Sequence, residues 1–395
     1  MNKIFPPNLL PLHKRNNIAF QYGRGPYLFG ADGRRYLDFV SGIAVNSLGH
    51  CHPQLVGAIK SQVEKYLLVG NMYRVPEQES LAERLCTSSF ANAIFFCNSG
   101  AEAIEGAIKM ARRTHFCEGN VHKNRIITME HAFHGRTIGA LAATGNPKYM
   151  EGFAPNLDGF DQVELSLGAI EAAIGKTTAA ILLEPILAEG GLHVVSNELF
   201  SGIRDLCDSH DLLLMVDEVQ TGIGRSGKLF AYEWTGVKPD IMTLAKGLGG
   251  GVPIGAVAVT DRVAQHMQPG THGSTFSGNS LAIAAGNAVF DVMFAPGFLA
   301  AVERVSAHMF ARGQSMVSEF PDLFEEVRGR GLLFGFKCRV PNAELVAAAL
   351  EEGLLCHVAG DNVLRFLPPL IINESHVDEA FVILGKVASQ YNVKQ

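Results

Sequence analysis

Short apolar runs alternate with helical patterns along most of the chain, and this alternation restricts the possible folds more than any other feature of the sequence. The runs are five or six residues long: AIFFC (93–97), RIITM (125–129), AAILLE (179–184), LLLMVD (212–217), DIMTLA (240–245) and GAVAVT (255–260). Apolar strands separated by helices indicate a mostly parallel sheet with helices on both faces. In such a sheet ligands bind beyond the carboxyl ends of the strands, so the residues that follow each run are the first candidates for a functional site.

The chain is 395 residues long, which allows two or three domains. After about residue 290 the pattern becomes rich in helices, with a strand pair near RGLLFGFKC (330–338) and a late strand in VLRFLPPL (363–370). We therefore expect an α/β protein in three parts: an N-terminal segment, 1–48, that packs with a smaller lobe; a large domain, 49–285, that contains the parallel sheet; and that smaller α+β lobe, 286–395.

Composition excludes several classes of partner. The 33 basic and 39 acidic residues give a net charge of −6, so no basic surplus exists to attract nucleic acid or anionic lipid. No apolar run approaches the length of about 18 residues that a membrane span needs. Pro6, Pro7 and Pro11 interrupt the N-terminal apolar stretch, which argues against a secretory signal. The seven cysteines are scattered, without a C-x-x-C pair, which predicts a cytoplasmic protein without a disulfide framework.

The first strand run leads through Asn98, Ser99 and Gly100 into a helix with one apolar face, formed by Ile104, Ala107, Ile108 and Ala111. Two interpretations of this junction remain open. Ser99 and Glu102 have the spacing of a capping box, which is a purely structural device. The free N–H groups at the start of a helix that begins with glycine also favour binding of a phosphate.

Two charged residues end neighbouring apolar runs. Asp217 ends LLLMVD, and a carboxylate at the end of a buried strand needs a cationic or hydrogen-bonding partner. That partner is either an ordinary arginine or helix cap, or a protonated heterocyclic nitrogen. Lys246 follows DIMTLA and precedes a glycine-rich segment. Although most lysines lie at the surface, a lysine in this position is partly desolvated, and the resulting neutral amine can attack an aldehyde.

Other motifs have a weaker claim to function. The segment 222–228 matches a glycine-rich nucleotide loop, but Leu229 stands where a P-loop has serine or threonine and no helical pattern follows, so we expect a turn-rich or mobile loop. Three His/Cys groups, at 50–52, 115–117 and 356–357, lack a third ligand at a known spacing, and we predict no metal site.

The cradle at Ser99 and Gly100, the carboxylate of Asp217 and the amine of Lys246 together describe a site for pyridoxal 5′-phosphate. At these residues the sequence resembles the class III aminotransferases. Six motifs occur in that family's order: NSGAEA (98–103), HAFHGR (131–136), EPILAEGG (184–191), DEVQTGIGRSG (217–227), LAKGLGGG (244–251) and HGSTFSGN (272–279). The resemblance extends from GHCHP (49–53) to RFLPPL (365–370).

The resemblance implies a fold-type I transferase that is a homodimer with shared active sites. It implies these roles at the cofactor: Lys246 attached to its aldehyde, Asp217 on the pyridine nitrogen, Gln220 near the phenolic oxygen, Phe133 stacked on the ring, Ser99, Gly100 and Ala101 on the phosphate, and Thr275 reaching the same phosphate from the neighbouring subunit. At the substrate it implies Arg136 on the carboxylate far from the reacting amine, Arg365 on the α-carboxylate of glutamate, Glu189 neutralising Arg365 when another donor is bound, and Ser274 nearby.

The same resemblance implies transfer of a terminal amino group from N2-acetylornithine to 2-oxoglutarate, with glutamate as product, in arginine biosynthesis. Two departures from the family pattern bear on this. Ile104 replaces a frequent asparagine in the helix after the cradle, which removes a local polar contact. Ile43 stands where enzymes that act on free ornithine carry tyrosine, which argues against ornithine as the preferred donor.

Several alternatives remain at this stage. Succinylornithine, 4-aminobutyrate, free ornithine and the succinylated diaminopimelate precursor of lysine are other possible donors or products. An aminomutase of the same fold would need no external keto acid. A nucleotide-binding protein would use the segment 222–228 and would be stabilised by nucleotide.

Overall fold

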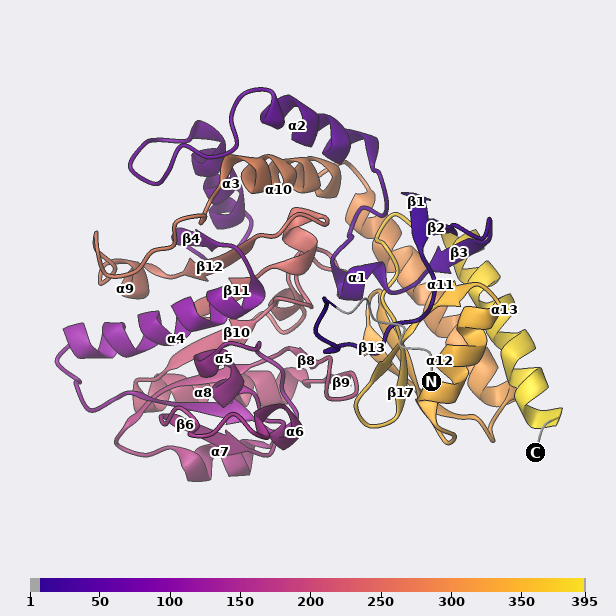
Figure 1. The fold of residues 1–395 in the computed structure, drawn as a ribbon. Helices are drawn as coiled ribbons and strands as arrows, with labels where there is room; N and C mark the ends of the chain where they lie inside the picture. Colours follow the sequence, from indigo (N-terminus) through magenta and orange to yellow (C-terminus); the bar gives the residue numbers. More distant parts are fainter. Residues whose placement is uncertain (1–7, 394–395) are drawn as a thin grey trace.

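The computed structural model describes residues 8–393, so residues 1–7 of the predicted N-terminal segment lie outside the described part. Two bodies of structure are visible in Figure 1: a large one around a seven-stranded sheet, and a smaller one, coloured orange to yellow, formed by about the last quarter of the chain. The N-terminal strands lie beside the smaller body.

The central sheet confirms the prediction of a mostly parallel arrangement. Its strand order is β4-β12-β11-β10-β7-β5-β6, and β12 runs antiparallel to both of its neighbours. The strands are β4 (Ala93–Cys97), β5 (Arg125–Met129), β6 (Phe160–Val163), β7 (Thr178–Leu183), β10 (Leu213–Asp217), β11 (Ile241–Leu244) and β12 (Gly255–Val259). Six of them are the apolar runs predicted as strands, and β6, FDQV, is the additional one at the edge.

Helices cover both faces of this sheet, which is why its inner strands are largely apolar. Successive residues of β7 belong to different cores. Leu182 packs with Ile104 and Ala107 of α4 (Gly100–Cys117), whereas Ile181 packs with the core that contains Phe200 of α8 (Asn197–His210). The remaining helices of the large body are α2 (Pro53–Val63), α3 (Pro76–Thr87), α5 (Ile138–Ala143), α6 (Pro147–Met150), α7 (Leu167–Ala173), α9 (Asp261–Ala264) and α10 (Ser280–Met293), with the 3₁₀ turns η1 (Ala231–Trp234) and η2 (Lys246–Gly249).

The smaller body contains the strands expected near 330–338 and 363–370. Its sheet has the order β13-β14-β17-β16, from β13 (Phe324–Arg330), β14 (Leu333–Cys338), β16 (His357–Ala359) and β17 (Val363–Phe366). Three helices pack on it: α11 (Phe298–Glu319), α12 (Asn342–Glu351) and α13 (Glu374–Val393). Phe334 and Phe336 of β14 stack with Phe366 and Phe381 in its core.

The two ends of the chain meet in a third sheet. Strands β1 (Phe20–Arg24), β2 (Tyr27–Gly30) and β3 (Arg35–Asp38) form an antiparallel meander, and β3 pairs in parallel with β15 (Leu354–Leu355). A two-stranded hairpin of β8 (Ile186–Leu187) and β9 (His193–Val194) lies beyond β7.

The segment after β3, α1 (Ser41–Ala44), is a left-handed turn. All four of its residues have positive φ, from 51° at Ser41 to 66° at Ile43. A β-branched residue in this region is strained, because its Cβ crowds the backbone. The carboxylate of Asp38 holds the start of the turn by accepting hydrogen bonds from the N–H groups of Val40 and Ser41, at 2.9 and 2.8 Å.

Within residues 8–393, no single helix has both the length and the apolar composition to cross a membrane, although α10 and α11 meet both criteria when taken together across their 73° bend.

Candidate active site

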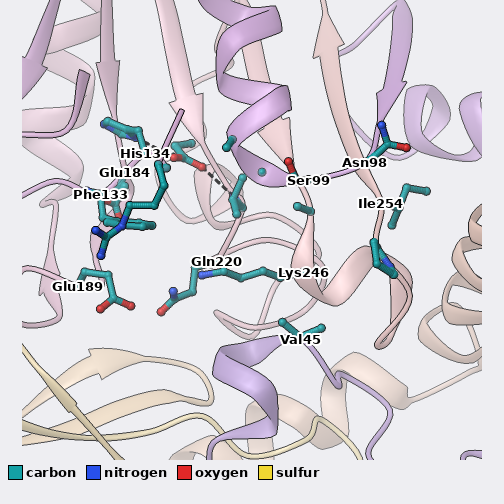
Figure 2. Close-up of a pocket in the computed structure, with 18 of the residues that line it drawn as sticks. Val45, Asn98, Ser99, Phe133, His134, Glu184, Glu189, Gln220, Lys246 and Ile254 are labelled. Atoms are coloured by element: carbon teal, nitrogen blue, oxygen red, sulfur yellow. Dashed lines mark hydrogen bonds and ion pairs between the residues drawn. The ribbon is translucent and has the colours of Figure 1, made fainter. Parts of the chain in front are cut away.

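A cavity of about 410 Å³ opens at the edge of the central sheet where the parallel strands end. The loops after β4, β5, β7, β10 and β11 all contribute to it, as expected for the carboxyl ends of parallel strands. Because β12 is antiparallel, its beginning also lies at this edge, and Pro253 and Ile254 line the cavity. Val45, which follows the left-handed turn, forms part of the opposite wall (Figure 2).

Lys246 extends across the middle of the cavity, with Glu189 and Gln220 on one side of it in Figure 2 and Asn98 and Ser99 on the other. Its backbone has a φ of 42°, unusual for a lysine. Burial lowers the pKa of the Lys246 amine to about 8, although the nearby Glu189 acts in the opposite direction. A substantial fraction of the amine is therefore neutral near physiological pH, which is the form that reacts with an aldehyde.

Asp217 ends β10 and is 4% exposed. Its Oδ1 accepts hydrogen bonds from the Val219 N–H and the Thr243 hydroxyl, at 3.0 and 3.1 Å. Its Oδ2 lies 2.8 Å from Nδ1 of His134. Burial disfavours protonation of His134, but the bond to Asp217 outweighs it and raises the pKa of the imidazole. The partner of the carboxylate is thus a histidine, and neither an arginine nor a helix cap.

The junction between β4 and α4 combines a helix cap with free N–H groups. The Ser99 Oγ accepts from the Glu102 N–H at 3.2 Å, and the Glu102 carboxylate reaches back to the N–H of Asn98, at 2.7 Å, instead of Ser99. The N–H groups of Gly100 and Ala101 belong to the first turn, where a helix has no backbone acceptors for them. Both open interpretations are therefore compatible with this geometry.

Glycines shape the space in front of these N–H groups. A Cβ on Gly100 would lie 2.7 Å from Cγ1 of Val219, and one on Gly135 would lie 2.8 Å from the Cβ of Ala101. The exposed backbone, the helix N-terminus and the cavity together fit an anionic group such as the phosphate of the predicted cofactor.

Arg365 is completely buried on β17, and two side chains of the cavity wall separate it from the cavity. Its Nη1 donates to Oε1 of Glu189 at 2.7 Å and to Oε1 of Gln220 at 3.2 Å. Its Nε and Nη2 have no hydrogen-bond partner in residues 8–393. Burial alone would raise the pKa of Glu189. The charge and hydrogen bond of the adjacent Arg365 together have a larger effect, so the pKa of Glu189 lies below its usual value. The arginine therefore has donors available for a further carboxylate.

Phe133 and Arg136 lie together on the loop after β5. The Arg136 guanidinium stacks on Tyr149, 4.0 Å from the ring centroid, and the Tyr149 ring meets Phe133 edge to face at 5.6 Å. Both Phe133 and Arg136 line the cavity, and Arg136 is exposed. The guanidinium of Arg136 is thus held by aromatic rings, and its N–H groups remain exposed to solvent.

Besides Arg365, two more of the predicted residues do not line the cavity of this chain. Ser274 lies behind its wall, where its hydroxyl accepts a hydrogen bond from Nδ2 of Asn98 at 3.1 Å. Thr275 is exposed at the surface.

Sequence reasoning missed Glu184 and His134, both of which line the cavity. The buried Glu184 carboxylate accepts from the N–H groups of Phe133 and Ala188, at 2.8 and 3.2 Å, and so fixes the loops after β5 and β7 to each other. Burial raises the pKa of Glu184 to about 7. Glu184 could have been found from the sequence, because it ends an apolar run predicted as a strand, as Asp217 does.

The segment 222–228 is turn-rich, as predicted, but it is almost entirely buried. The Arg225 side chain donates to the carbonyls of Leu332 and Pro368, and Lys228 pairs with Glu303 at 2.8 Å. The next element is the short 3₁₀ turn η1, and no α-helix begins directly after the segment to form a nucleotide cradle. Among the described residues, only His115, Glu118 and Asp211 are grouped closely enough to hold a metal, and Arg262 already pairs with both carboxylates.

Comparison with known proteins gives a consistent result over the whole chain. The family described as Aminotransferase class-III matches residues 12–388. A protein of Bradyrhizobium diazoefficiens named acetylornithine aminotransferase 1 is 52% identical over 390 residues, covering 98% of this chain and 96% of the relative. An acetylornithine aminotransferase of Agrobacterium fabrum is 53% identical over 383 residues, covering 96% of each chain.

Solved structures are also similar. The ornithine aminotransferase of Toxoplasma gondii superposes with a TM-score of 0.93 at 30% identity, covering 97% of this chain and 93% of the other. The N-acetylornithine aminotransferase of Stenotrophomonas maltophilia superposes with a TM-score of 0.85 at 34% identity, covering 96% and 98%.

Proposed function

The chain belongs to the class III aminotransferases, enzymes that use pyridoxal 5′-phosphate, and we propose that it transfers the δ-amino group of N2-acetylornithine to 2-oxoglutarate. Relatives that are 52 and 53% identical over nearly their full length and are named for this donor support the proposal. The observation that carries it is the ion pair of Glu189 and Arg365 beside the cavity. Arg365 is neutralised by Glu189 but keeps N–H donors without a partner, so it suits both a donor without a carboxylate beside its reacting amine and a glutamate that has one.

The cavity fits the cofactor. Lys246 would hold its aldehyde, Asp217 its pyridine nitrogen and Gln220 its phenolic oxygen, with Phe133 against the ring. The first turn of α4, from Ser99 to Ala101, would hold the phosphate. When bound, the cofactor supplies an electron-withdrawing ring that stabilises negative charge on the carbon that loses its proton.

The protein's own contribution is to move that proton and to keep the ring nitrogen charged. The neutral Lys246 amine would accept the proton from the carbon that bears the reacting amine and would deliver it to the former aldehyde carbon of the cofactor, so that the amino group stays with the cofactor when the donor leaves as a carbonyl compound. Asp217, held by three hydrogen-bonding groups, keeps negative charge where the ring nitrogen would bind.

Recognition of the two substrates would be divided between two arginines. Arg136, at the cavity mouth, would bind the carboxylate far from the reacting amine in both half-reactions. Glu189 would neutralise Arg365 while N2-acetylornithine is bound, since that donor has no carboxylate beside its terminal amine. When glutamate binds, Glu189 would move away and the free Nη2 of Arg365 would clamp the α-carboxylate.

A donor panel with 2-oxoglutarate as acceptor tests the proposal. N2-acetylornithine should give the highest kcat/KM, ahead of succinylornithine, free ornithine and 4-aminobutyrate. A different donor in first place would replace the proposed substrate. Turnover of an amino acid without any keto acid would indicate an aminomutase instead.

We also propose a homodimer. Apolar side chains are exposed along 63–73 and near the predicted phosphate contact Thr275: Val63, Leu67, Leu68, Val69, Met72, Tyr73 and Phe276. Exposed apolar side chains in this number are typical of an interface, and a hydrogen bond from Asn71 to the Ser274 carbonyl, next to Thr275, supports a site shared between subunits.

A cytoplasmic location is a further proposal, supported by seven cysteines that all remain free thiols. We propose a division of the chain into the three predicted parts, with the second boundary moved from 285 to the end of α10 (Ser280–Met293), because this helix packs as one unit against α2 and α3 of the large body. The pairing of β3 with β15 supports the association of the first part with the third.

A further inference from the structure

A second cavity, of about 290 Å³, lies on the other side of the segment 222–228, where the large and small bodies meet. One wall consists of Ser226 and Trp234, from the loop after β10 and from η1. The opposite wall consists of Phe310 on α11 and the turn between β13 and β14. The backbones approach closely here, because a Cβ on Gly331 would lie 2.3 Å from the carbonyl carbon of Ser226.

Arg330, at the end of β13, lines this cavity with an unpaired cation. Within residues 8–393 its guanidinium makes no ion pair and no hydrogen bond. It lies over the ring of Trp234, with its Cζ 5.0 Å from the ring centroid. Other arginines of the same lobe differ: Arg328 pairs with Asp361, and Arg339 lies within 3.8 Å of Glu325. Burial lowers the pKa of Arg330, so the charge is partly desolvated. An unpaired, partly desolvated arginine is uncommon and indicates a place for an anion.

Ser226 supplies a second unused group in the same wall. It is completely buried, and its Oγ has no hydrogen-bond partner in the described part of the chain. Buried hydroxyls are almost always hydrogen-bonded, so this one calls for an explanation. Because Ser226 has no exposed surface, its hydroxyl lies behind the cavity wall, and Arg330 is the charged donor that faces the cavity.

The remaining lining favours an organic anion over an inorganic one. Trp234, Phe310 and Ala307 give the cavity an apolar surface. The acidic group in the wall, Glu303, is already paired with Lys228 at 2.8 Å, so it does not cancel the charge of Arg330. A volume of about 290 Å³ is close to the lower limit for small-molecule sites.

We propose that this cavity is a binding site for a small organic carboxylate, whose anionic group pairs with Arg330 and whose carbon body packs against Trp234 and Phe310. The site is separate from the active-site cavity, because the two share no lining residue. The proposed site is nevertheless connected to the active site. Arg225, which precedes Ser226, donates a hydrogen bond to the carbonyl of Pro368, and Pro368 lies three residues after Arg365.

The sequence provides a reporter for this site, because Trp234 is the only tryptophan. Tryptophan fluorescence of the holoenzyme would be titrated with sodium benzoate, sodium propionate and inorganic phosphate at equal ionic strength. Benzoate should produce a saturable change at the lowest concentration, propionate should need more, and phosphate should produce none.

Four variants define where the probe binds. R330Q should weaken benzoate binding by about tenfold or more, the effect expected when a charge-assisted hydrogen bond is lost. S226A should leave it unchanged, because the Ser226 hydroxyl is completely buried behind the cavity wall. R339Q, which removes a paired and exposed arginine of the same lobe, should leave it unchanged. R136Q should also leave it unchanged, because Arg136 belongs to the active-site cavity.

Several results would overturn the proposal: no saturable change with any probe, an unchanged affinity in R330Q, or a response that R136Q abolishes. Saturation by phosphate in preference to benzoate would overturn the carboxylate assignment. Should R330Q not fold, R330K keeps the charge but loses the planar fork, and it should show intermediate weakening by equilibrium dialysis of benzoate.

Discussion

Lys246 illustrates how one residue links burial, reactivity and stability. Its amine has a pKa of about 8 in the folded protein, below the value of 10.5 of a free side chain. Burial is the main cause, since a buried ammonium loses its hydration. The same burial that makes the amine reactive therefore makes its protonated form costly for the folded state.

This cost predicts a specific pH dependence of the apoenzyme. Below pH 8 the lysine is protonated in both the folded and the unfolded protein, so the folded state bears the full cost of burying an ammonium group. Between pH 8 and 10.5 the lysine is neutral in the folded protein and still protonated in the unfolded protein. The free energy of unfolding therefore rises with pH in this range as that cost is removed. K246M should therefore be more stable than wild type by about 1–3 kcal/mol below pH 8, with the difference shrinking toward pH 10.5. Urea unfolding of both apoenzymes across this range is the measurement. A difference that does not change with pH would contradict the prediction.

A second prediction at the residue scale concerns the charge of Asp217. Asn in its place retains an oxygen for the N–H of Val219 and the Thr243 hydroxyl but has no negative charge. D217N should lower kcat by about 10² to 10³, a typical effect of losing one electrostatic group in an active site, with little change in cofactor content or Tm.

Asp240 provides the matched control. It accepts hydrogen bonds from Arg204 and from the N–H of Leu214 outside the cavity. D240N should therefore lower stability while leaving kcat unchanged. Near wild-type turnover by D217N, in steady-state assays at saturating substrate, would exclude the proposed electrostatic role.

At the scale of secondary-structure elements, the site depends on β17 and on the loop between β8 and β9, which hold Arg365 and Glu189 opposite each other. If Glu189 neutralises Arg365 in only one half-reaction, E189Q should slow the N2-acetylornithine half-reaction by about tenfold or more, because a buried charge is left uncompensated. It should spare or improve the glutamate half-reaction. R136A should impair both.

Single-turnover changes in the visible absorbance of the bound cofactor separate the two half-reactions. Equal losses in both for E189Q would mean that Glu189 and Arg365 form a static ion pair.

The elements also show why part of the site could be predicted and part could not. The strands that carry Asp217 and Lys246 are continuous apolar runs, so both their existence and their ends were visible in the sequence. β6 was missed because FDQV, at an edge, has two adjacent polar residues in its middle and is too short for a clear pattern. The burial of the segment 222–228 depends on carbonyls of the distant Leu332 and Pro368, which no local pattern encodes. The link between His134 and Asp217 likewise joins the loop after β5 to the end of β10 and is not visible in either motif alone.

At the scale of the whole molecule, the exposed apolar surface along 63–73 predicts that assembly and activity are coupled. Met72 is 86% and Tyr73 66% exposed in the single chain. The double variant M72D/Y73D should place two charges in the interface and shift the protein toward monomers in sedimentation equilibrium, with a parallel loss of activity.

Phe116 is the control, since it is 62% exposed at the end of α4 and outside this surface. F116D should remain dimeric and active. A fully active monomer of M72D/Y73D would show that each subunit has a complete site of its own.

The way in which the sheets close has a consequence for the synthesis of this protein. β4 lies at the edge of the central sheet and pairs there with β12, and β3 pairs with β15, which lies more than three quarters of the way along the chain. Chains emerge from the ribosome with their N-terminus first, so β3 and β4 are made long before their partners. Until then they present unpaired apolar edges, which are the usual starting points of aggregation. The nascent chain should therefore depend on chaperones for longer than a protein of the same size with local strand pairing, and its yield should fall when translation slows between β4 and β12.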